Sequence, residues 1–213
     1  MNIHTYIKGA IETESKIKQV ESQYPVDLTL LIGIEAGEIV DMVKKHIFYK
    51  RKFDIVKWNE HLSKLSRLVD AAVLDGEPPF AHYDTNTRLF HAAVGIFTEG
   101  AELLEAINNA HKENKPIDQT NFREENGDVE WYQAIAYDEM KIDPEDNFQN
   151  NHTKLDKIRY KNKGFTIDSA NNRNLEAEKH VLENLVKSKP ANEKHTINID
   201  EWPWPTSENM KIK

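Results

Sequence analysis

The chain has 213 residues, no cysteine and a formal net charge of −8. This length suits one sizeable core or two small ones, and the lack of cysteine excludes disulfides and thiolate metal sites. The absence of a long basic run argues against binding to a nucleic-acid backbone. Because no signal peptide and no apolar run of membrane-spanning length is visible, we expect a cytoplasmic protein.

Helical periodicity is common along the chain and strand-like alternation is scarce, which predicts an all-α fold. Long helices are expected at residues 25–48, 54–74, 87–112 and 118–140, with a fifth at 171–186. The run Asp75-Gly76-Glu77-Pro78-Pro79 separates the second helix from the third, because glycine and proline end helices. After Ser188 the chain has no apolar period, so we expect an extended or disordered tail whose Trp202 and Trp204 could dock on a surface.

Residues 27–72 can be laid over residues 91–136 without a gap, at an offset of 64 residues. The identical acidic residues are Glu35 with Glu99, Glu38 with Glu102, Asp54 with Asp118, and Glu60 with Glu124. The apolar positions of the two segments also agree. We interpret this register as a duplicated helix hairpin. The alternative is two unrelated amphipathic hairpins that share a period.

Two acidic pairs lie on the third and fourth long helices, and the residues of each pair are three apart, so they share a helix face. The pairs are Glu99 with Glu102 and Glu125 with Asp128. Most such pairs are solvated surface, but the first shares its face with Ala92, Gly95 and Ala106, which indicates a close approach by another group. Four carboxylates converging across a hairpin would repel each other without a cation. Oxygen ligands suit Mg²⁺, or Mn²⁺, so we predict a metal site.

At these residues the chain resembles the MazG-like all-α nucleoside triphosphate pyrophosphohydrolases, especially their phage-encoded branch. The two motifs read Glu99-Gly100-Ala101-Glu102 and Glu124-Glu125-Asn126-Gly127-Asp128. The family commonly has Glu-Ala-Gly-Glu and Glu-Glu-Leu-Gly-Asp. This chain therefore inverts the small pair and has Asn126 in place of leucine, and neither change removes a ligand.

The resemblance implies hydrolysis of a nucleoside triphosphate, ribo or deoxy, to its monophosphate and pyrophosphate, in the host cytoplasm if the gene belongs to a phage. It implies that Mg²⁺ is held by Glu99, Glu102, Glu125 and Asp128, with Glu124 or Glu125 as general base. The substrate-binding residues that it implies are Asn151, Lys154, Arg159 and Tyr160. From the residues alone, surface salt bridges for the two basic residues and a core role for Tyr160 fit equally well.

The first half resembles the family incompletely. Glu35-Ala36-Gly37-Glu38 is the usual first motif, but His61 and Lys64 stand where the second copy has Glu125 and Asp128. We therefore expect His61 and Lys64 to face Glu35 and Glu38. The predicted units are a degenerate hairpin (1–75), a linker (76–86), a catalytic hairpin with a C-terminal segment (87–185) and a tail (186–213).

Other functions remain open at this point: a nucleotide-binding protein without catalysis, a hydrolase of a guanosine alarmone, and a purely structural helical adaptor. Metal binding and hydrolysis of nucleoside triphosphates would discriminate among them. Family members generally pair hairpins from two subunits, and a duplication could bring both hairpins into one chain. We therefore expect a two-hairpin bundle within each chain, in which only the second hairpin supplies the metal site, and a homodimer stays open.

Overall fold

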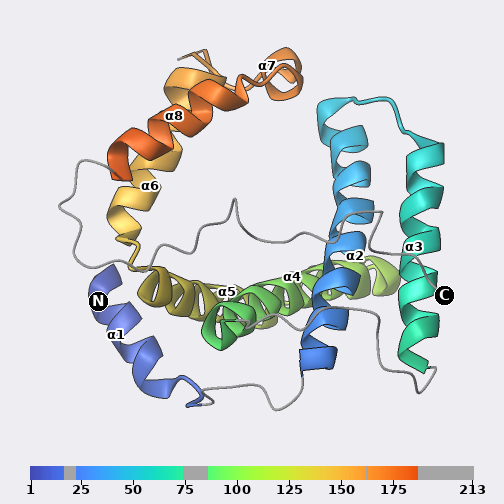
Figure 1. Ribbon diagram of the computed structural model, residues 1–213, viewed down its shortest axis with the longest axis horizontal. Coiled ribbons are helices and arrows are strands. Elements are labelled where there is room, and N and C mark those ends of the chain that lie inside the picture. The colour runs from blue at the N-terminus through green and yellow to red at the C-terminus, as the bar shows by residue number, and fades with distance from the viewer. Residues whose placement is uncertain (17–22, 74–85, 162, 187–213) are drawn as a thin grey trace.

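The computed structural model describes residues 1–16, 23–73, 86–161 and 163–186, and every regular element in these ranges is helical (Figure 1). The all-α prediction is thus confirmed. The predicted linker and tail, including Trp202 and Trp204, lie outside the described residues apart from Asn86 and Val186. The elements are α1 (Ile3–Thr13), α2 (Gln23–Tyr49), α3 (Ile55–Val73), α4 (Thr87–Glu113), α5 (Gln119–Met140), α6 (Pro144–Thr153), the π-helix η1 (Lys154–Arg159), α7 (Ile167–Asn171) and α8 (Leu175–Val186).

Helices α4 and α5 pack against each other as a hairpin. Helix α4 begins after Asn86, whose side chain accepts a hydrogen bond from the backbone nitrogen of Leu89 at 3.0 Å. It ends at Asn114, which takes the left-handed conformation (φ 51°) that terminates many helices. Asp118 then caps α5 by accepting from two backbone nitrogens, as N-cap aspartates do. The short connection turns α5 back along α4.

Helices α2 and α3 form a separate hairpin, and α2 crosses α4 where the two hairpins meet (Figure 1). The end of α2 and the loop after it also contact α7 near the C-terminal end of the described chain. Arg51 Nε donates to Asn171 Oδ1 at 2.6 Å, and Asn171 Nδ2 donates to the carbonyl oxygen of Tyr49 at 2.9 Å. This pair of hydrogen bonds fixes α7 to the tip of the first hairpin.

Helix α1 packs on α5 and is absent from the helices expected from the sequence. Tyr6 donates its hydroxyl hydrogen to the carbonyl oxygen of Gly127 at 3.2 Å. Trp131 Nε1 donates to Thr13 Oγ1 at 3.0 Å. These bonds place the N-terminal helix of the chain beside the second hairpin, next to the acidic residues of α5.

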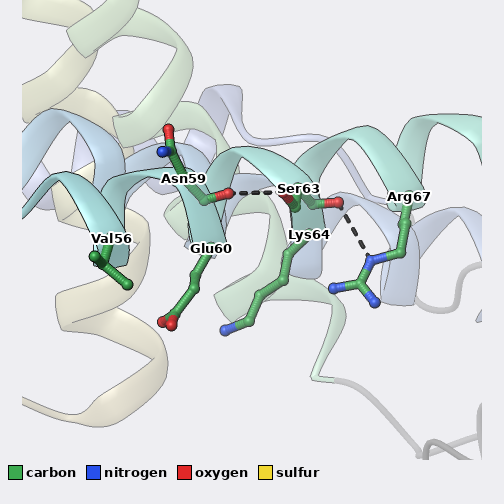
Figure 2. A pocket seen from close by; sticks show the side chains of 6 residues that line it. All are labelled: Val56, Asn59, Glu60, Ser63, Lys64 and Arg67. Atoms are coloured by element: carbon green, nitrogen blue, oxygen red, sulfur yellow. Dashed lines mark hydrogen bonds between the residues drawn. The ribbon is translucent and has the colours of Figure 1, made fainter.

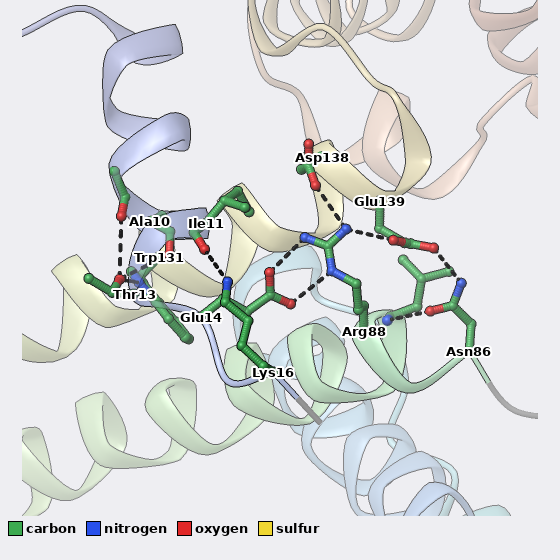
Figure 3. A network of polar contacts seen from close by, with 12 residues as sticks. Ala10, Ile11, Thr13, Glu14, Lys16, Asn86, Arg88, Trp131, Asp138 and Glu139 are labelled. Atoms are coloured by element: carbon green, nitrogen blue, oxygen red, sulfur yellow. Dashed lines mark hydrogen bonds and ion pairs between the residues drawn. The ribbon is translucent and has the colours of Figure 1, made fainter. Parts of the chain in front are cut away.

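Arg88 joins α1 to both helices of the second hairpin (Figure 3). Its Nε and Nη2 donate to the two oxygens of Glu14 at 2.8 and 2.7 Å, while Nη1 lies 2.8 Å from Asp138 and 2.7 Å from Glu139. These hydrogen bonds raise the pKa of the guanidinium further above its ordinary value. Because Glu14 is buried, its bidentate partner Arg88 fixes the end of α1 against the start of α4.

The apolar core is small within the described part of the chain. The large side chains that are fully buried there are Val26 and Ile135. Many large apolar residues of α2 and α4 are exposed instead, with Val40 at 53%, Phe48 at 63% and Leu104 at 56%. None of the described helices combines the length and the apolar character that crossing a bilayer requires.

Candidate metal centre

Three carboxylates converge on the face that α4 and α5 share. Glu99 and Glu102 come from α4 and Glu125 from α5, and one carboxylate oxygen from each lies within 4.8 Å of the other two. Glu99 is buried, Glu125 half-buried and Glu102 exposed. The group therefore has an inner end within the hairpin and an outer end that solvent reaches.

Small residues on α4 let α5 come close at this point. Ala92 is 1% exposed. A Cβ atom built on Gly95 would lie 2.2 Å from carbons of the Tyr132 ring, which is closer than any real contact. The close approach indicated by the small residues is therefore made by Tyr132, which lies seven residues after Glu125 on α5.

Burial and mutual repulsion disfavour the ionisation of the Glu99 and Glu125 carboxyl groups. Burial raises the pKa of Glu99, and the neighbouring carboxylates of Glu102 and Asp128 raise it further. Desolvation and then Glu102 likewise raise the pKa of Glu125. Asn121 Nδ2 donates to Glu125 at 2.9 Å and orients that carboxylate. A cation placed among the three groups would remove the repulsion that raises these pKa values.

Asp128 and Glu124 lie at the edge of this group. Asp128 is exposed and is not one of the three residues whose oxygens meet within 4.8 Å, although its charge raises the pKa of Glu99 and of Tyr132. Glu124 is exposed, and its charge contributes to the raised pKa of Glu125. Both are therefore close enough to act on the site electrostatically.

The donor set fits a hard divalent cation. All three groups offer oxygen, and Mg²⁺ typically binds one or two carboxylates while keeping several waters. Mn²⁺ accepts the same ligands. A zinc site usually includes histidine or cysteine nitrogen or sulfur ligands, and this group has neither. The three residues could therefore hold a metal ion, and its identity as Mg²⁺ or Mn²⁺ stays a prediction.

The four predicted substrate-binding residues lie on α6 and η1 or directly after them. Asn151 is exposed, and Lys154 and Tyr160 are half-buried. Arg159 donates to the buried Glu178 of α8 through Nε at 3.0 Å and Nη2 at 2.7 Å. The Tyr160 ring packs near Phe165, with centroids 5.8 Å apart. No hydrogen bond or ion pair between described residues joins these four to the acidic group, so their role stays a prediction.

Two residues that no sequence pattern marks, Tyr6 and Arg88, hold α1 against the second hairpin. Tyr6 reaches Gly127 from α1, and the charges of Glu130 and Asp128 contribute, after burial, to its raised pKa. The apolar spacing of Ile3, Ile7 and Ile11 could have revealed this helix. Nothing local marks Arg88, because its partners are 50 or more residues away in sequence.

A surface depression of about 450 Å³ lies elsewhere, along α3 (Figure 2). Every described residue that lines it comes from this one helix. It therefore lacks the convergence of groups from two helices that distinguishes the acidic site. The lining residues are Val56, Asn59, Glu60, Ser63, Lys64 and Arg67.

Comparison of the chain with protein-family models, with curated proteins and with solved structures gives no significant match. The resemblance to the MazG-like family therefore rests on the motifs alone. Function has to be argued from the geometry and chemistry of the acidic group.

Proposed function

We propose that this protein hydrolyses a nucleoside triphosphate to its monophosphate and pyrophosphate with the help of Mg²⁺. The observation that supports this most is the convergence of Glu99, Glu102 and Glu125, whose oxygens lie within 4.8 Å of one another. A group that disfavours its own ionisation at a helix interface suits a functional site better than a purely structural one. Asp128 would complete the ligand set from the solvent side.

The carboxylates would divide two tasks between them. When bound, Mg²⁺ would neutralise phosphate charge and make a water molecule more acidic. Glu124 or Glu125 would accept the proton of a water molecule that attacks the α or β phosphorus, and the bond from that phosphorus to the bridging oxygen would break to release the monophosphate and pyrophosphate.

The basic residues of η1 would bind the phosphates. Lys154 and Arg159 belong to a π-helix, a type of element that is frequent at functional sites. A planar guanidinium can bind two phosphate oxygens at once. Arg159 would then exchange its present partner Glu178 for the substrate, while Arg173 keeps Glu178 neutralised through its own contact at 2.6 Å. Asn151 and Tyr160 would contact the remainder of the nucleotide.

We further propose that two copies of the chain associate. Large apolar side chains of both hairpins are exposed, and few are fully buried among the described residues. A second copy could cover the exposed faces of α2 and α4, because surfaces of this kind mark interaction sites. The second copy would then supply the packing that the single chain lacks.

The function is tested by measuring pyrophosphate release from a panel of ribo- and deoxynucleoside triphosphates and a guanosine alarmone. We expect release with Mg²⁺ and none with excess chelator. Glu102→Gln should abolish it, whereas Glu105→Gln, an exposed residue on the same helix, should keep it. A folded protein that binds nucleotide but hydrolyses nothing would replace the proposal with a non-catalytic binding role. Binding of neither metal nor nucleotide would indicate a structural adaptor.

A further inference from the structure

In both hairpins the first helix ends and the second helix begins at equivalent residues when the two are compared at an offset of 64 residues. Helix α2 ends at Tyr49 and α4 at Glu113. The next residue of each, Lys50 and Asn114, has a left-handed backbone with φ of 54° and 51°. A left-handed residue thus ends the first helix of each hairpin at a matching position.

The second helices of the hairpins begin with the same hydrogen bonds. Asp54 Oδ1 accepts from the backbone nitrogen of Lys57 at 3.1 Å, and Asp118 Oδ1 accepts from that of Asn121 at 3.3 Å. Helix α3 starts one residue after the first aspartate, and α5 one residue after the second. All of these positions match at the offset that the acidic motifs define.

At the same offset of 64 residues, a polar group in the first hairpin corresponds to the acidic group of the second. His61, which corresponds to Glu125, donates from Nδ1 to Glu35 Oε2 at 2.6 Å. Lys64, which corresponds to Asp128, places Nζ 3.4 Å from Glu35 Oε1. Glu35 itself corresponds to Glu99, and both carboxylates are largely withdrawn from solvent.

We propose that the first hairpin is a second copy of the candidate metal centre in which His61 and Lys64 replace two ligands and the cation together. This inference rests on the proposed metal site but not on the reaction. The expectation that both residues face Glu35 is met, whereas Glu38 is exposed. The Lys64 ammonium gives Glu35 the positive charge that a divalent ion would give Glu99.

The residues around the polar group of the first hairpin also differ from those around the acidic group of the second. The positions of Gly95 and Tyr132 are occupied in the first hairpin by Leu31 and Leu68, which are both half-buried. Nε2 of the buried His61 has no hydrogen-bond partner among the described residues. A buried polar atom without a partner is costly, which fits a histidine that replaced a ligand at an inherited buried position. The first hairpin therefore keeps the geometry of the site and has lost its chemistry.

The inference is tested by titrating the full chain with Mn²⁺ without substrate. We expect one site in the wild type, lost in Glu102→Gln and kept in Glu35→Gln. The double variant His61→Glu/Lys64→Asp should gain a second site, which the additional change Glu35→Gln should remove. A wild-type site lost in Glu35→Gln, or a folded double variant that gains none, would overturn the inference. A wild type that binds no Mn²⁺, together with a double variant that gains a Glu35-dependent site, would count against the proposed function alone, because the double variant reports on the first hairpin independently.

Thermal unfolding provides a test that does not require metal. Lys64→Met should lower the melting temperature by about 2–4 °C, because the half-buried Glu35 loses a charged partner. The matched change Lys57→Met, at an exposed lysine of the same helix, should leave it unchanged. Equal melting temperatures for the two variants would show that Lys64 does not neutralise Glu35.

Discussion

Gly95 is the residue at which the packing around the acidic group is least tolerant. An added methyl group would lie 2.2 Å from two carbons of the Tyr132 ring and 2.4 Å from its Cγ atom near the backbone, so the ring cannot simply swing away. We expect Gly95→Ala to destabilise the protein by about 1–3 kcal/mol. Chemical denaturation would measure this. Gly100→Ala is the control, because nothing lies within 4 Å of its added methyl group, and alanine there should be neutral or stabilising.

Removing one carboxylate from the acidic group should separate stability from activity. Glu102→Gln and Asp128→Asn should each abolish metal-dependent turnover. In chelator, both variants should melt at or above the wild-type temperature, because each removes a negative charge that raises the pKa of Glu99. Scanning calorimetry together with an activity assay checks both. Activity near that of the wild type in either variant would contradict its assignment as a ligand.

The packing of helix α8 against η1 depends on one buried residue, Glu178, which bonds to Arg159 and Arg173. Arg159 and then Arg173 lower the pKa of Glu178 to about 2, from an ordinary value near 4.5. A lowered folded-state pKa stabilises the protein above the unfolded pKa, and this stability is lost as the pH falls through the folded value. We therefore expect about 3 kcal/mol of stability to disappear between pH 4.5 and 2.

The acid sensitivity is checked by following unfolding against pH for the wild type and for Glu178→Gln. The variant should be less stable than the wild type at pH 7, and its stability should change less across the acid range. Parallel curves for the two proteins would show that Glu178 does not carry this dependence. Glu183→Gln, at an exposed glutamate of the same helix, is the control.

The four long helices could be predicted because their apolar period runs for many turns and because aspartate, asparagine, glycine and proline mark several of their ends. The predicted fifth helix (171–186) corresponds to α8, which begins four residues later at Leu175, whereas the short helix α7 ends at Asn171, where the predicted helix starts. Residues 172–174 separate α7 from α8, where Asn171 makes a tertiary bond to Tyr49 and Arg173 a local bond to Glu178. Helix α1 was missed because it is short and is held chiefly by distant partners such as Arg88 and Gly127.

The acidic group could be predicted in large part because each pair is spaced by one helical turn, and the hairpin that joins the pairs has recognisable ends. Sequence spacing cannot give the depth of each carboxylate, so Asp128 was placed equally with the other three. The bond between Arg159 and Glu178 could not be foreseen either, since it joins residues on different elements. Local patterns thus give the candidates, and their pairing depends on tertiary packing.

At the scale of the whole molecule, the exposed apolar faces predict association. We expect the full chain to be a dimer by light scattering coupled to size exclusion. Ile47→Glu on α2 or Leu104→Glu on α4 should shift it to a monomer, because a charge cannot be buried in an apolar interface without a partner. Val69→Glu, at an exposed apolar position of α3, is the control. A wild-type chain that stays monomeric as its concentration is raised would contradict this prediction.

The central claim is that the acidic group of α4 and α5 supports cleavage between the α and β phosphates of a nucleoside triphosphate. Phosphorus NMR of the reaction mixture tests it most directly, because it identifies the products. We predict nucleoside monophosphate and pyrophosphate in equal amounts, formed only with a divalent cation and not by Glu102→Gln. Formation of nucleoside diphosphate and orthophosphate, or product formation that Glu102→Gln leaves unchanged, would contradict the account.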